Sequence, residues 1–122
     1  MGKSVNDLVL DAAFDVIDQS NIMIACSAEP TNRTEAVTTY ALADAVMVAD
    51  TDYTKANGDT SGRKVTMAAK STINVDASGT ATHVALCDGV NLLYVTTCTS
   101  QALTAGNDAN FPAWDIEIAD PV

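Results

Sequence analysis

Positively charged residues are scarce in this sequence. Six Lys and Arg residues stand against sixteen Asp and Glu residues, which gives a formal net charge of −10. Binding to DNA or RNA needs clustered cations that displace the counterions of the phosphates, and an anionic membrane surface also attracts basic residues. The charge balance therefore argues against both, and we expect no nucleic acid and no membrane among the partners.

Long apolar runs are also missing. No stretch approaches the roughly 20 apolar residues that span a bilayer. The N-terminal segment MGKSVNDLVLDAAFDVIDQSN lacks the uninterrupted apolar stretch of a signal peptide, so we expect a chain that is made in the cytosol and stays soluble. With 122 residues, of which 48% are apolar and 18% charged, it corresponds to one globular domain.

Cysteine and histidine are too few for a disulfide framework or a structural zinc site. The three cysteines are Cys26, Cys87 and Cys98, no CxxC motif occurs, and His83 is the one histidine. An odd number of cysteines cannot all pair, and a structural zinc ion needs four Cys or His ligands. We interpret the three thiols as small buried apolar groups in a reducing compartment.

Residues 4–18 have the spacing of an amphipathic helix. Ser4 is a plausible N-cap, with Asp7 three residues later. Four aspartates occupy the polar side, and the apolar stripe must be covered by a sheet or a neighbouring subunit. The apolar positions are Val5, Leu8, Val9, Ala12, Ala13, Val16 and Ile17.

The remaining chain has the pattern of short strands between turns. Strands are expected at residues 22–28, 45–49, 63–69, 73–75, 80–87, 92–98 and 111–118. Residues 35–49 are ambiguous between helix and strand, and we favour a loop before the strand at 45–49. Polar residues 50–62 predict one long loop, and residues 101–110 a second turn region.

This pattern predicts a mainly β fold: an antiparallel β-sandwich, jelly-roll or immunoglobulin-like, with one N-terminal amphipathic α-helix. The helix, residues 1–20, is a candidate docking arm, and residues 21–122 form the sandwich domain. Residues 80–98 predict a hairpin around Gly89 and Val90. That turn places Cys87 opposite Leu92 and Cys98 opposite Ala81, too far apart along the ladder for a disulfide.

Patterns that suggest catalysis are incomplete. His83 and Cys87 share a strand face but have no orienting residue and no oxyanion loop. Gly58–Lys64 resembles a phosphate-binding loop, yet Val65 stands where Ser or Thr is needed. Asp115 and Glu117 resemble a glycosidase pair, although a solvated sheet edge explains them better.

Acidic side chains in the long loop offer oxygens to a hard cation such as Ca²⁺. Asp50, Asp52, Asn57 and Asp59 do not have the spacing of an EF-hand, and we favour a charged solvent-exposed loop. We therefore predict a protein that is not an enzyme, with no catalytic, cofactor-binding or metal-binding residue. No cofactor is expected.

Three segments carry a resemblance to known proteins. They are the apolar strand and acidic-proline turn from Ile22 to Pro30, the hairpin from Gly79 to Gly89 with Leu92 and Leu93, and Ala102–Gly106 followed by Phe111 and Pro112. In these segments, within residues 20–120, the chain resembles small virion structural proteins of tailed bacteriophages, described as head-decoration, minor structural or tail-fibre-like proteins.

The resemblance implies a non-enzymatic virion protein that decorates the capsid or forms a minor head component. Its partners would be phage capsid or tail proteins and further copies of itself, with assembly in the host bacterial cytoplasm and exposure on the virion. A tail or fibre-base component is the alternative within the family. A small host-surface or glycan-binding module is an alternative of another class, with Tyr53, Tyr94 and Trp114 as the aromatic candidates.

Overall fold

The computed structural model describes residues 4–120. Within them lie one α-helix, one π-helical turn and nine β-strands. In chain order the elements are α1 (Asp7–Ile17), β1 (Ile22–Cys26), η1 (Glu35–Thr39), β2 (Ala41–Val46), β3 (Tyr53–Asn57), β4 (Arg63–Met67), β5 (Lys70–Asn74), β6 (Gly79–Cys87), β7 (Leu92–Leu103), β8 (Asp108–Phe111) and β9 (Trp114–Ile118).

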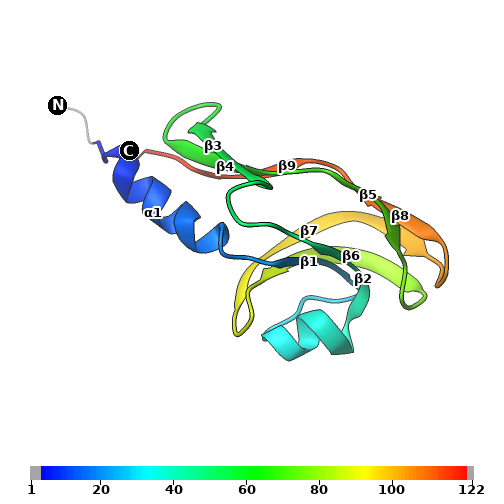
Figure 1. Ribbon diagram of the computed structural model, residues 1–122. Coiled ribbons are helices and arrows are strands. Elements are labelled where there is room, and N and C mark those ends of the chain that lie inside the picture. The colour runs from blue at the N-terminus through cyan, green and yellow to red at the C-terminus, as the bar shows by residue number, and fades with distance from the viewer. Residues whose placement is uncertain (1–3, 121–122) are drawn as a thin grey trace.

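The strands form two layers, with α1 at one end of the molecule (Figure 1). One layer is a four-stranded antiparallel sheet in the order β2-β1-β6-β7. The other contains the three-stranded sheet β3-β4-β9 and the pair β5-β8, which also run antiparallel. The fold is therefore mainly β, with antiparallel sheets and one N-terminal helix, as the sequence predicts.

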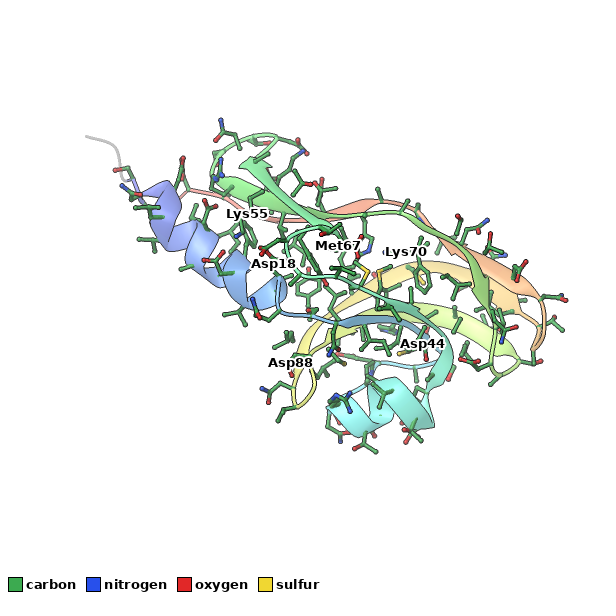
Figure 2. All side chains as sticks on the ribbon, viewed as in Figure 1. Asp18, Asp44, Lys55, Met67, Lys70 and Asp88 are labelled. Carbon is green, nitrogen blue, oxygen red and sulfur yellow. The ribbon has the colours of Figure 1, made fainter. Side chains whose placement is uncertain are left out.

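The main hydrophobic core draws on α1 and on both layers. Met23 and Leu86 come from the four-stranded sheet, Val65 and Met67 from the three-stranded sheet, and Phe14 from the helix. Figure 2 shows Met67 between the layers. The rings of Tyr94 and Trp114 stack with centroids 6.0 Å apart and join β7 to β9. The core therefore combines aromatic rings with small and sulfur-containing side chains.

A second apolar cluster lies on the outer face of the four-stranded sheet. Ile24 and Cys26 of β1 pack with Ala85 and Cys87 of β6, and Ala36 of η1 belongs to the same cluster. Both faces of β1 are therefore covered, which explains why four of its five residues are buried rather than every second one.

Two expectations in the first half of the chain are wrong. The strand placed at 45–49 lies at Ala41–Val46, directly after η1, because its residues pair with β1 in the register Met23↔Ala45. The loop placed at 50–62 contains β3, whose Tyr53 is buried and opposite Met67. In both segments pairing with a neighbouring strand outweighs local composition.

The turn between β3 and β4 shows why composition suggested a loop there. The Gly58 N–H donates to the Gly62 carbonyl at 2.9 Å, and Gly62 has a φ of 70°, in the region that favours glycine. The segment that resembled a phosphate-binding loop is thus a hairpin turn.

The C-terminal strands also differ in extent. The strand expected at 92–98 continues to Leu103, and the strand expected at 111–118 is divided into β8 and β9 at Pro112, which has no N–H for a ladder. Cys87 does lie opposite Leu92, as predicted. Cys98 does not lie opposite Ala81, because two irregularities in the ladder together bring Gln101 to that position.

Candidate docking surface

Helix α1 begins later than the sequence suggested. Its N-cap is Asn6, whose side-chain oxygen accepts a hydrogen bond from the Leu8 N–H at 2.8 Å, and not Ser4. Asp7 lies in the first turn, where a negative charge is favourable next to the helix dipole. The helix ends at Ile17, with Asp18 as its C-cap.

The acidic side of α1 contacts the cations of the three-stranded sheet. The Arg63 guanidinium donates to both carboxylate oxygens of Asp11, with Nε to Oδ1 at 2.9 Å and Nη2 to Oδ2 at 3.3 Å. Lys55 is paired with Asp15 and lies 4.0 Å from Asp18. Figure 2 labels Lys55 and Asp18 near the C-terminal end of α1. Two-point contact of a guanidinium with a carboxylate fixes orientation as well as distance. These pairs and the burial of Leu10 and Phe14 together hold one rotation of the helix about its axis.

The rotation buries a narrow side of α1 and exposes most of its apolar stripe. Leu10 and Phe14 are buried, and Phe14 is only 1% exposed within the main core. In contrast, Leu8 is 78%, Val9 62% and Val16 54% exposed. We call the exposed stripe formed by Leu8, Val9, Ala12, Ala13 and Val16 the α1 face.

The orientation of α1 is the reverse of that of a typical amphipathic surface helix. Such a helix turns its apolar stripe to the core and its charges to solvent. Here Asp11 is half-buried against Arg63 while Leu8 and Val9 face solvent. The sequence predicted the stripe and its need for a cover. It did not predict that the molecule's own sheets leave the stripe open.

The C-terminal end of α1 is held by buried polar groups. The Asp18 carboxylate accepts a hydrogen bond from the Asp50 N–H at 2.6 Å, and the Tyr53 hydroxyl donates to the Ser20 carbonyl at 2.9 Å. Burial raises the pKa of Asp18, and it raises the pKa of Tyr53 to about 12. Tyr53 is therefore a neutral structural anchor that is not available as an exposed binding platform.

A groove lies on the side of the molecule where β7 faces β8 and β9. Its volume is about 530 Å³, its apolar wall includes Ala81, Val84 and Leu103, and Asn107 and Asp108 lie on its polar side. A shallower extension reaches Trp114 and Asp115. Trp114 and Tyr94 are half-buried and stack on one another, so one face of each ring is covered by the other ring.

The environments of the three cysteines do not favour a reactive thiolate. Cys26 and Cys87 are fully buried, and burial raises the pKa of both thiols, that of Cys26 to about 12. A thiol with so high a pKa is protonated at neutral pH and unreactive. Cys98 is half-exposed in β7, and burial also raises its pKa. None of these three cysteines is in a disulfide.

His83 is held on the outer face of the four-stranded sheet. Its Nδ1 lies 2.8 Å from the Thr82 hydroxyl, and the residue pairs in register with Cys26 and Thr97. Cys87 is four residues away along β6, which corresponds to about 13 Å at the usual rise per residue. The structure does not bring this pair together.

The acidic residues of the expected loop are separated and mostly neutralised by lysines. Asp52 accepts hydrogen bonds from Lys70 at 2.9 Å and from the Val48 N–H at 2.7 Å, and Asp59 pairs with Lys64 at 2.7 Å. Lys64 also lies 3.8 Å from Asp115. Within residues 4–120, no group of three or more His, Cys, Asp or Glu side chains is placed to hold a metal ion.

Comparisons with known proteins do not assign the chain to a family. No helix in the described part of the chain has the length and apolar character to cross a membrane. Comparison of the chain with models of known protein families, with curated proteins and with solved structures finds no match. The α1 face and the surfaces around it are therefore the features of the molecule that bear on its function.

Proposed function

We propose that this chain is a non-enzymatic structural protein of a bacteriophage particle, most simply a capsid-decoration or minor head protein, which attaches through the α1 face. The exposed apolar stripe of α1 carries the proposal. Covering this stripe removes several aliphatic side chains from water at about 25 cal/mol per Å² of apolar area. The resemblance of the strand and turn segments to tailed-phage virion proteins is the reason for proposing a phage particle as the structure to which the chain attaches.

Charge supports attachment to protein rather than to packaged genome. The net charge of −10 repels nucleic acid, and Asp7 and Asp15 remain exposed on α1, next to the apolar stripe. We expect the receiving surface to be an apolar groove with basic residues at its rim, because such a surface complements both features. Many symmetric copies on one shell would then add weak individual contacts together through avidity.

The alternatives within the proposal differ in copy number. A head-decoration protein is present in many copies on each particle, whereas a tail or fibre-base component is present in a few. A glycan-binding module has less support, since Tyr53 is buried and the rings of Tyr94 and Trp114 are stacked on each other.

The test is quantitative mass spectrometry of purified particles from the phage that encodes the chain. We expect the chain in a fixed ratio to the major capsid protein, and its absence from particles overturns the proposal. Particles that lack the chain are then incubated with purified protein, and Leu8→Lys should abolish attachment. The matched control is Val90→Lys in the β6–β7 turn, because Val90 and Leu8 are both 78% exposed. Equal attachment of both variants would refute docking through the α1 face.

A further inference from the structure

Strand β7 has a free edge. It is the last strand of the sheet β2-β1-β6-β7, and within residues 4–120 no strand pairs with its other side. With 12 residues, Leu92–Leu103, it is also the longest element of the fold. A free edge presents unpaired N–H and C=O groups that another strand can use.

Strand β7 lacks two of the devices by which proteins usually block such pairing, although its ladder with β6 is irregular between Thr97 and Gln101. Charged side chains and proline on an edge strand prevent association with another chain. The β7 sequence LLYVTTCTSQAL contains neither. Every other strand at the margin of a described sheet carries a charge: Asp44 on β2, Lys55 on β3, Asp115 on β9, Lys70 on β5 and Asp108 on β8.

We propose that β7 pairs with β7 of a second copy of this chain, antiparallel across a two-fold axis, to form one continuous eight-stranded sheet. The charge distribution favours a second copy as the occupant. Two molecules of charge −10 repel each other, and β7 is the edge at which they can meet without placing carboxylates or ammonium groups opposite each other. Antiparallel pairing is also self-complementary, as a two-fold axis requires.

The two-fold axis restricts the register. In an antiparallel pair of identical strands, an axis perpendicular to the sheet places one residue directly opposite itself. An axis at Cys98 would pair residues 93–103 with their copies and leave out Leu92, at the end of β7 that follows the β6–β7 turn. The irregular stretch of β7 between Thr97 and Gln101 would then lie at the centre of the pairing. It includes the exposed stretch from Thr99 to Ala102. The two Cys98 residues then lie opposite each other, next to the groove that each lines.

The pairing gives a structural basis to the self-association that the resemblance implies, and it is tested on the purified chain of 122 residues without any particle. Sedimentation velocity across micromolar concentrations should show a monomer–dimer equilibrium. Thr99→Lys should raise the dimer Kd by about tenfold or more, because it places two ammonium groups near the axis. Thr54→Lys on β3, an exposed threonine on another edge strand, is the matched control and should leave the Kd unchanged.

Oxidation tests the register. Directly opposed residues have Cα atoms about 4.5–5.5 Å apart, within the range that a disulfide spans. Copper phenanthroline should therefore cross-link the dimer through Cys98, because Cys26 and Cys87 are fully buried. Cys98→Ser should abolish the cross-link, and Thr99→Lys should reduce it together with the dimer. An intact dimer that forms no cross-link overturns the register through Cys98.

Two further outcomes overturn the pairing itself. One is a monomer at all concentrations. The other is a dimer that Leu8→Lys disrupts and Thr99→Lys leaves intact, because that result moves the contact to the α1 face. Circular dichroism of each variant confirms that the fold is retained. Absence of the chain from phage particles would refute the proposed function without affecting this pairing, so the two failures are distinguishable.

Discussion

Two buried aspartates at the centre of the structure have opposite effects on its stability. Burial raises the pKa of Asp18 above its usual value of 3.8. Burial also acts on Asp52, but hydrogen bonds from Lys70 and from the Val48 N–H, with the charge of Lys70, outweigh it and hold the pKa below 3.8. The first residue favours the folded state when protonated and the second when ionised.

Asp18 and Asp52 therefore make opposite contributions to the pH dependence of the free energy of unfolding. The stability that Asp18 provides is present below its unfolded pKa and is lost as pH rises through its folded pKa. The stability that Asp52 provides is present above its unfolded pKa and is lost as pH falls through its folded pKa. As pH rises from about 3 to about 7, the Asp18→Asn variant should therefore become more stable relative to the unmodified chain. Over the same range the Asp52→Asn variant should become less stable relative to the unmodified chain.

Urea unfolding of both variants and of the unmodified chain, followed by circular dichroism over that pH range, measures the two differences. Each asparagine keeps an oxygen to accept the N–H bond from Asp50 or Val48, so the charge is the main change. Differences that change in the same direction with pH for both variants would contradict the opposed roles.

Helix α1 is the element whose environment the sequence predicted least well. Periodicity identified its residues and its apolar stripe, because spacing along the chain determines which side chains share a face. It could not determine which face turns inward. That choice depends in part on Arg63, 52 residues after its partner Asp11, and on Lys55, 40 residues after its partner Asp15. Their pairing with the acidic side of α1 competes with burial of Leu8 and Val9.

The strands show the same division between local and long-range information. The β6–β7 hairpin was predicted with its Cys87↔Leu92 pair because Asp88 and Asn91 form a local turn, in which the Asp88 side chain accepts the Val90 and Asn91 N–H groups. Strand β3 was missed because its polar residues look like a loop until Tyr53 meets Met67. A turn can be predicted from residues that are neighbours in sequence. The pairing of an edge strand such as β3 cannot, because it depends on a partner strand.

The rotation of α1 has a direct mutational consequence. Phe14→Ala should lower the free energy of unfolding by about 3–5 kcal/mol, because it leaves a cavity in the core. Leu8→Ala, on the same helix, should change it by no more than about 0.5 kcal/mol, because the side chain is exposed. Thermal and urea unfolding of the two variants at low protein concentration measure both values. Comparable losses in the two variants would mean that the helix packs with its other side inward.

At the scale of the whole molecule, three features lie on different parts of one acidic surface. The α1 face is apolar and has acidic neighbours, the β7 edge is uncharged, and the remaining surface carries most of a net charge of −10. Contacts through the first two therefore respond differently to salt. Attraction between acidic residues on α1 and a basic partner weakens as ions screen it, whereas repulsion between identical acidic molecules is relieved.

We therefore expect added salt to strengthen the association of the purified chain with itself. Raising the ionic strength from 0.01 M to 0.15 M shortens the screening length from about 30 Å to about 8 Å. The dimer Kd measured by sedimentation should fall over this range, since β7 contributes no ion pair to the contact. Attachment to particles through the α1 face should weaken over the same range. A dimer that dissociates as salt is added would require ion pairs across the contact, and β7 has no charged side chain to form them.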